Sequence, residues 1–179
     1  VANHKLNVTF INHATVLLQY DSINVLTDPV WSNRISPVSF IGPHRKRKPG
    51  IKFEHQPPID VVIISHNHYG HMDMPTLKKL KNEHDPLFIV PLGNKKLMDK
   101  KGLTRNIELD WWDEYYYKDE HKITLVPAEH FSMRGLCDRN TTLWGGYMLQ
   151  SKKGNIFFAG DTGFSDHFQE IKDRFGEIY

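Results

Sequence analysis

The chain has 179 residues, of which 39% are hydrophobic and 25% charged, so its length and composition suit one globular domain and exclude a disordered chain. The net charge of +2 does not favour a nucleic-acid partner, and the single cysteine, Cys137, excludes an intrachain disulfide. No stretch has the pattern of a signal peptide or the length of a membrane span. We therefore expect a cytoplasmic protein, although a segment preceding Val1 would not be visible in this sequence.

The first third of the chain predicts strands joined by tight turns. Residues 6–11, 15–20 and 23–27 are rich in β-branched side chains. Residues 29–58 carry a run of prolines and predict a long irregular loop, of a kind that is often functional. Within it, residues 44–48 form a strong basic run. We interpret this run as a solvated loop, with contact to phosphates or to a membrane surface as the alternative.

The rest of the chain mixes strands with helices, and this pattern predicts a layered α/β domain over residues 1–179. Residues 60–65 are expected to form a strand around a continuous apolar run at 61–64, which is typical of a strand buried on both faces. The other expected strands are residues 87–90, 107–109 and 122–126, with a hairpin of 142–150 and 155–159. The expected helices are residues 74–84, 93–100 and 165–175.

Three histidines directly follow the apolar run. His66 and His68 are two positions apart, so in extended backbone their side chains point the same way and can approach one ion. His71 follows Gly70, where the chain can turn, so its side chain can face a second position close to the one approached by His66 and His68. Neutral imidazole suits zinc or iron, and three histidines with an open position describe a site that can activate water. The alternative, a histidine-rich surface loop without a metal, is disfavoured by this spacing.

Three further residues are candidates on weaker grounds. His130 follows a predicted strand, and Asp161 lies between two glycines after another, where a carboxylate can complete one metal site or bridge two ions. A turn or a helix cap is the alternative role for Asp161. Asp73 directly precedes the expected helix at 74–84, and there we favour capping over a role in the site.

An aromatic group at residues 111–117 lies among acidic side chains. Acidic neighbours argue against stacking on nucleic-acid bases and favour packing in the core. Phe131 and Met133 flank His130 and line either an apolar substrate pocket or the core. Cys137 has no evident partner base, so we do not expect it to act as a nucleophile.

Together these motifs resemble a known family. The segment His-Asn-His-Tyr-Gly-His at residues 66–71 resembles the His-x-His-x-Asp-His signature of the metallo-β-lactamase superfamily. His130 and Asp161 resemble its third histidine and its bridging aspartate, in the same order and at similar separations. The chain is also similar to one branch, the N-acylphosphatidylethanolamine-hydrolysing phospholipase D group and its bacterial relatives. The segments that carry this similarity are residues 13–15, 26–29, 42–43, 57–60, 65–69, 90–93, 109–112 and 157–163.

The resemblance implies the αβ/βα sandwich of that superfamily, of which this chain would span the N-terminal half to two-thirds. It implies a hydrolase that uses a metal-bound hydroxide on a phosphodiester, ester or lactone bond. Ascorbate-6-phosphate lactonase is a more distant likeness. The implied cofactor is one or two zinc ions, with iron or manganese as alternatives, and the implied substrate is a small or lipid-like molecule.

The resemblance also assigns roles to single residues. The first ion would be held by His66, His68, His130 and Asp161. His71 and Asp161 would contribute to a second ion and act in catalysis. The resemblance places Asp28 and His13 near the site but not among the ligands, and a carboxylate in such a position commonly orients ligating histidines. Asp73 is the third candidate of this kind.

Two departures from the family pattern leave an alternative open. Gly70 stands where the family has aspartate, so the second ion lacks a ligand, and the chain ends soon after the Asp161 segment, where the family continues. The alternative is a catalytically impaired or inactive metal-binding fragment of the same fold. Because half of a sandwich would expose its core, we expect self-association or a missing C-terminal part. A lipid-like substrate would also bring peripheral contact with a membrane.

Overall fold

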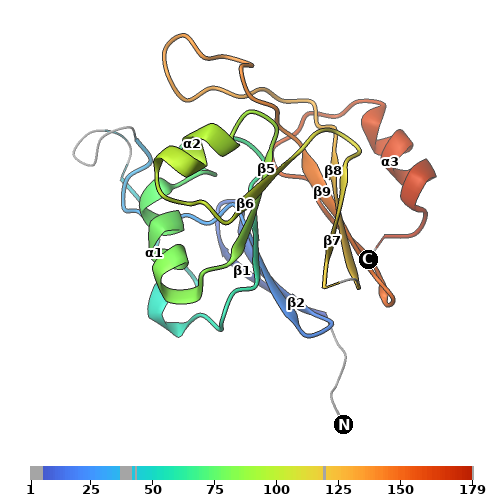
Figure 1. Cartoon of the computed structure of the whole chain (residues 1–179), viewed down its shortest axis with the longest axis horizontal. Coiled ribbons are helices and arrows are strands. Elements are labelled where there is room, and N and C mark those ends of the chain that lie inside the picture. Colours follow the sequence, from blue (N-terminus) through green and yellow to red (C-terminus); the bar gives the residue numbers. More distant parts are fainter. Residues whose placement is uncertain (1–5, 37–41, 43, 119, 179) are drawn as a thin grey trace.

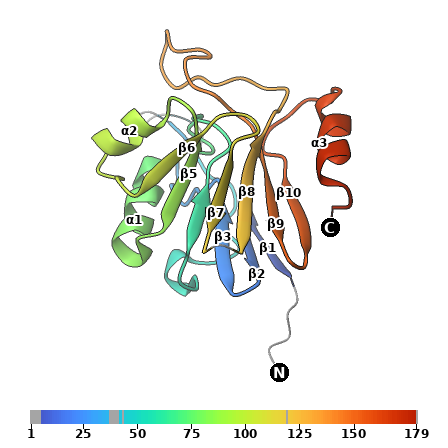
Figure 2. The same cartoon turned by 45° about the vertical axis from the view of Figure 1, so that its right-hand side comes forward.

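Two β-sheets face one another, and helices cover the outer side of each (Figure 1). This computed structural model describes residues 6–36, 42, 44–118 and 120–178. The view in Figure 2 looks across the four layers, with the helices of the first half of the chain on one side and the last helix on the other. The layered α/β architecture predicted from the sequence is confirmed.

The first sheet contains six strands in chain order. They are β1 (Asn7–Asn12), β2 (Thr15–Tyr20), β3 (Ile23–Thr27), β4 (Val61–Ile63), β5 (Leu87–Pro91) and β6 (Asn106–Leu109). Strands β1 to β3 are antiparallel, whereas β3 to β6 are parallel and need crossover connections. The crossovers contain a 3-10 turn (Phe53–His55), α1 (Met74–His84) and α2 (Lys95–Lys100).

The second sheet is antiparallel, with strand order β10-β9-β8-β7. Its strands are β7 (Glu114–Tyr117), β8 (His121–Val126), β9 (Gly146–Ser151) and β10 (Gly154–Phe158). The last helix, α3 (His167–Phe175), lies on its outer face. The predicted hairpin is β9–β10, although β9 begins at Gly146 rather than at residue 142.

Strand alternation sorts the apolar side chains into layers. In β4, Val61 and Ile63 belong to the core between the sheets, whereas Val62 and the following Ile64 belong to the core under α1. The outer face of the second sheet packs on Ile171 of α3. Burial on both faces explains why residues 61–64 are a continuous apolar run. Burial of apolar surface of this kind is the main stabilising contribution to the fold. The rigid strands then position the loops at their ends.

Strand β7 is absent from the elements predicted above. Its residues belong to the aromatic group that was expected to pack in the core. Tyr115 and Tyr117 do pack against the core between the sheets, together with Trp111. Tyr116 points away and is 56% exposed, because alternate residues of this edge strand face opposite sides.

The proline-rich loop and its basic run are only partly as predicted. Lys46, Arg47 and Lys48 are exposed. Arg45 instead turns inward, and its guanidinium donates hydrogen bonds to the carbonyls of Val30 and Ser32 at 3.0–3.3 Å. Residues 37–41 and 43 lie outside the described residues. Across the described ranges, no helix has the length and apolar character needed to cross a membrane.

Candidate metal centre

The expected site residues follow strands that end at one edge of the two sheets. Asp28 follows β3 and His66 lies just beyond β4, and these parallel neighbours bring their carboxyl ends side by side. His130 follows β8 and Asp161 follows β10 in the second sheet. A β-bridge joins the segments that carry these last two residues. The structure thus brings together side chains that are far apart in the sequence.

His66, His68 and His130 form the first group of side chains. The Nε2 atom of His66 is 2.8 Å from Nδ1 of His68 and 3.3 Å from Nε2 of His130. One nitrogen from each residue lies within 4.8 Å of the other two. His66 is buried, and the other two are half-buried at the edge of the site.

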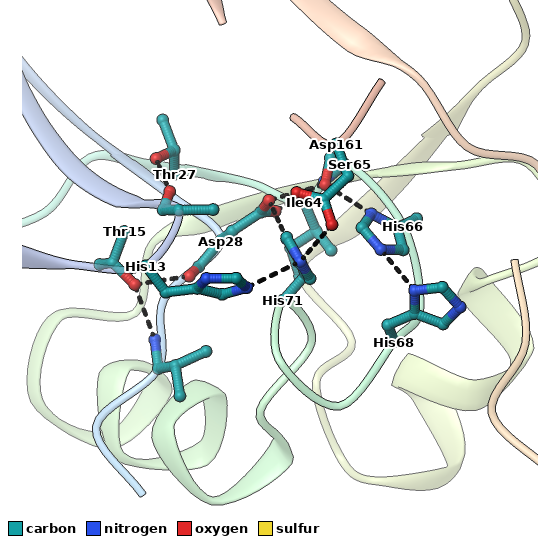
Figure 3. Close-up of polar contacts among 12 residues, drawn as sticks. His13, Thr15, Thr27, Asp28, Ile64, Ser65, His66, His68, His71 and Asp161 are labelled. Carbon is teal, nitrogen blue, oxygen red and sulfur yellow. Dashed lines mark hydrogen bonds and ion pairs between the residues drawn. The ribbon is translucent and has the colours of Figure 1, made fainter. Parts of the chain in front are cut away.

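The tautomer of His66 follows from its neighbours (Figure 3). The Asp28 carboxylate accepts the hydroxyl proton of Ser65 across 2.6 Å. Because a hydroxyl has one proton, the Ser65 oxygen must accept a hydrogen bond from Nδ1 of His66, 2.8 Å away. Neutral His66 therefore carries its lone pair on Nε2, which faces His68 and His130. Ser65 acquires a positioning role that the sequence analysis did not assign.

His71 is the centre of the second group. Its Nδ1 donates to Oδ2 of Asp28 at 2.7 Å, so its Nε2 points away from Asp28. There Oδ2 of Asp161 and Nε2 of His13 each lie 3.2 Å from His71 Nε2 (Figure 3). The ligand atoms of His66, His71 and Asp161 converge within 4.8 Å of one another. Asp28 thus orients one histidine in each group.

The two groups differ in charge in the metal-free protein. Burial and the neighbouring histidines lower the pKa of His66 to about 2, and burial also lowers the pKa of His68 and of His130. Burial acts in the same direction on His71, but hydrogen bonds to its two carboxylate neighbours outweigh it and raise its pKa to about 9. The hydrogen bond from His71 in turn lowers the pKa of Asp161. At neutral pH the first group is uncharged and the second is an ion pair.

The donor set of the first group fits a divalent transition metal. Zinc binds imidazole nitrogen at about 2.0–2.1 Å, so two ligands of one tetrahedral ion lie roughly 3.3–3.5 Å apart. His66 and His130 show such a spacing, 3.3 Å between their Nε2 atoms. The inward lone pair of His66 faces only imidazole nitrogens within this group, and a shared cation would satisfy all of them. Imidazole donors suit zinc or iron, whereas magnesium and calcium prefer oxygen.

Arg134 and Phe131 support residues 66–72, the histidine loop, from a distant part of the chain. One guanidinium nitrogen of Arg134 donates to the carbonyls of Asn67 and Met72 at 2.8 and 2.9 Å, one on each side of His68. Phe131 packs edge-on against His68, with ring centroids 4.9 Å apart, so it lines the site rather than the core. No local pattern marked Arg134, because its contacts with the loop are formed only by folding.

Asp73 occupies the N-cap of α1 as predicted, but its contacts differ from those of a simple cap. Its carboxylate accepts hydrogen bonds from the backbone N–H and hydroxyl of Ser32 and from the hydroxyl of Thr76. No backbone N–H of the first helical turn bonds to its side chain. Its hydrogen-bond partners in the described part of the chain are therefore a loop serine and a helix threonine rather than a site histidine.

A cavity of about 1100 Å³ lies beside the site rather than within it. Asn67 and Tyr69 of the histidine loop contribute to its wall, together with Arg134 and residues of α1. None of the predicted metal ligands lines it. Because the chemistry depends on the converging histidines and Asp161, we place the candidate site there and assign no substrate to this cavity.

Comparison with known proteins identifies the family. A family model described as the beta-lactamase superfamily domain matches residues 23–178, which is most of the chain. The chain belongs to the metallo-β-lactamase superfamily. The superfamily resemblance drawn from residues 66–71, His130 and Asp161 is thereby confirmed.

Two curated relatives support the similarity to the N-acylphosphatidylethanolamine-hydrolysing phospholipase D branch of the superfamily. The chain is 38% identical to N-acyl-phosphatidylethanolamine-hydrolyzing phospholipase D 1 of Caenorhabditis elegans, over 96% of this chain and 51% of that protein. It is 34% identical to the mitochondrial phospholipase D of the same name from Saccharomyces cerevisiae, over 94% of this chain and 37% of that protein. The chain therefore spans about half or less of the length of these relatives.

A solved structure shows the same fold at low sequence identity. The diiron β-hydroxylase CmlA from Streptomyces venezuelae superimposes with a TM-score of 0.73 and 19% identity. The match covers 99% of this chain and 34% of that enzyme. At this identity the likeness concerns the metallo-β-lactamase fold alone.

Proposed function

We propose that this protein is a metal-dependent hydrolase acting on a phosphodiester, ester or lactone bond. The observation that carries the proposal is the convergence of nitrogens from His66, His68 and His130 on one point, with the His71–Asp161 pair beside it. Superfamily membership and the similarity to two phospholipases D support hydrolysis as the reaction class.

Different residues of this chain would hold the metal and act in catalysis. His66, His68 and His130 would hold one ion, with Asp161 as a further ligand shared with the position beside His71. When bound, zinc lowers the pKa of water towards about 7 and so supplies hydroxide at neutral pH. The Asp161 carboxylate is 40% exposed and is placed to meet water or substrate, whereas the His71 side chain behind it is 3% exposed. These positions support the predicted catalytic roles of Asp161 and His71.

A phospholipid-like substrate is the finer part of the proposal. It is supported by the names of the two phospholipases D, and Phe131 beside His68 offers an apolar surface at the site. Zinc is the proposed metal, with iron or manganese as alternatives, because imidazole and carboxylate donors accept all three. Contact with a membrane surface, self-association, the absence of a nucleic-acid partner and a cytoplasmic location stay predictions.

Turnover by metal-loaded protein tests the proposal. Protein stripped with a chelator and reloaded with zinc, iron or manganese would be assayed on bis(p-nitrophenyl) phosphate, on N-acylphosphatidylethanolamine in micelles, on an aryl ester and on a lactone. We expect turnover of at least one substrate, lost on chelation and restored by metal. Asp161→Asn should reduce it strongly, whereas His55→Ala, at an exposed histidine of the 3-10 turn, should not.

The absence of turnover on all four substrates, in protein that holds its metal, would overturn the proposal. It would favour the second candidate, a metal-binding protein impaired in catalysis. Gly70 is the observation that favours this candidate, because it contributes no side chain beside His71.

A further inference from the structure

We propose that His13 is a metal ligand that completes a second ion position with His71 and Asp161, in the place where Gly70 offers no side chain. The inference deepens the proposed function, since the second ion would lie beside the one held by His66, His68 and His130. It assigns to this chain a ligand from the turn between β1 and β2, well before the histidine segment in the sequence.

The distances around His71 match a shared ion. Its Nε2 is 3.2 Å from Nε2 of His13 and 3.2 Å from Oδ2 of Asp161. Two ligands bound to zinc at about 2.0–2.1 Å lie at roughly this separation. Since Nδ1 of His71 is engaged by Asp28, its Nε2 offers one proton or one lone pair to two neighbours. A cation bound to Nε2 of His71 would take that lone pair, and each neighbour is at the distance of a second ligand from it.

The turn that carries His13 is held against the site. The hydroxyl of Thr27 donates to the carbonyl of Ala14 at 2.7 Å, and the hydroxyl of Thr15 donates to the carbonyl of Asp28 at 2.7 Å. His13 itself has φ +42°, in the left-handed region that few residues other than glycine adopt. Such strained backbone is concentrated at functional sites. Hydrogen bonds on both sides thus keep a strained turn where it presents an imidazole to His71.

Gly70 leaves room for this imidazole. A Cβ atom at position 70 would lie 3.4 Å from Nε2 of His13 and 3.6 Å from its Cδ2. A longer side chain there would therefore reach the space that the His13 ring occupies. We infer that the glycine and the histidine are alternative ways to fill one position beside His71.

His13 and Asp161 are farther apart than two ligands of one ion, so a closed site requires one of these side chains to move towards the other. His13 is not part of either set of ligand atoms that converge within 4.8 Å. His13 is exposed and Asp161 is half-buried, so either side chain can rotate towards the other. In Figure 3 they approach His71 from different sides.

Ring packing alone would also place His13 here, since the two imidazoles make an edge contact with centroids 4.8 Å apart. His13→Phe separates the two roles, because phenylalanine keeps an aromatic ring and has no nitrogen. His13→Ala removes both features, and His55→Ala is the matched control at another exposed histidine. Thermal unfolding of each variant shows which of them fold.

The measurement is a titration of metal-free protein with Co²⁺, read by elemental analysis of bound ions and by visible absorption. We expect two bound ions in the wild type and in His55→Ala. In His13→Phe and His13→Ala the first ion should remain, and affinity for the second should fall at least about tenfold, the lower limit for loss of a partner of a metal ligand. The double variant His13→Ala/Gly70→Asp should regain the second ion.

The proposal is overturned if the wild type binds one ion only, or if His13→Phe binds two ions as tightly as the wild type. A wild type that binds no ion would contradict the proposed function as well. Retention of the first ion therefore distinguishes failure of the His13 assignment from failure of the metal site as a whole.

Discussion

The two sides of His66 are built from similar residues but are prepared differently for a cation. On one side, His68 and His130 are neutral imidazoles, because burial and repulsion from His71 lower the pKa of each. On the other side, His71 is protonated and paired with Asp161 across 3.2 Å. A cation can enter the first group without displacing a proton, whereas entry into the second must release the proton of His71. A carboxylate neighbour thus makes a histidine a stronger base. In the metal-free protein the same neighbour keeps that histidine protonated, so it cannot bind a cation until the proton leaves.

The largest effect is expected on the first side, from His68→Ala. Loss of an outer partner of a ligating histidine costs about 10–100-fold in metal affinity, so loss of a ligand should cost more than about 100-fold. Metal content of the purified variant, by elemental mass spectrometry and by competition with a chelator, checks this. His55→Ala should keep its metal. Unchanged metal content in His68→Ala would refute the assignment of His68 as a ligand.

Asp28→Asn tests whether both sides depend on one carboxylate. One carboxylate oxygen of Asp28 accepts hydrogen bonds from the Ser65 hydroxyl and from His71, and the other accepts the Ser65 backbone N–H. In asparagine one of these two oxygens becomes an NH₂ group, which cannot accept a hydrogen bond, so at least one of the contacts is lost. We expect both ions to bind about 10–100-fold more weakly. Asp73→Asn is the matched control, because this buried carboxylate bonds Ser32 and Thr76.

Asp73→Asn should lower the stability by about 1–3 kcal/mol, the usual cost of leaving a buried polar group without its partner, with metal affinity unchanged. Isothermal titration with zinc and chemical unfolding of the metal-free variants measure the two effects separately. Equal losses of metal affinity in the two variants would show that Asp28 has no special link to the histidines.

The smallest effect is the pH dependence of stability in the metal-free protein, where the two sides act in opposite directions. The ordinary histidine pKa is about 6.5. The raised pKa of His71 adds stability that is complete below about pH 6.5 and is lost as the pH rises through about 9. The lowered pKa of His66 means that the unfolded chain binds more protons below about pH 6.5, so stability falls there.

We therefore expect the thermal midpoint to decline on both sides of about pH 6.5, by an amount on the order of a few degrees. Scanning calorimetry of metal-free protein measures it. His71→Gln should flatten the alkaline decline and leave the acid one. An alkaline decline of the same slope in that variant would mean that other groups cause it.

The elements that the sequence predicted correctly are those in which one face or both are buried. The apolar run at residues 61–64 and the spacing of Leu77 and Leu80 reflect burial directly, so β4 and α1 could be predicted from pattern alone. β7 was missed because an edge strand with acidic and aromatic residues has no apolar periodicity to mark it. The aromatic side chains were nevertheless expected in the core, where most of them pack.

The candidate ligands also show which features a local sequence pattern predicts and which depend on the tertiary structure. The sequence by itself determined the family and the residue types at the site, because metal chemistry restricts ligands to a few side chains at characteristic spacings. Only the tertiary structure decided that Asp28 orients His66 through Ser65 and that His13 lies beside His71. Those contacts join segments from separate strands and turns, and their distances depend on how the two sheets pack, which no local pattern encodes.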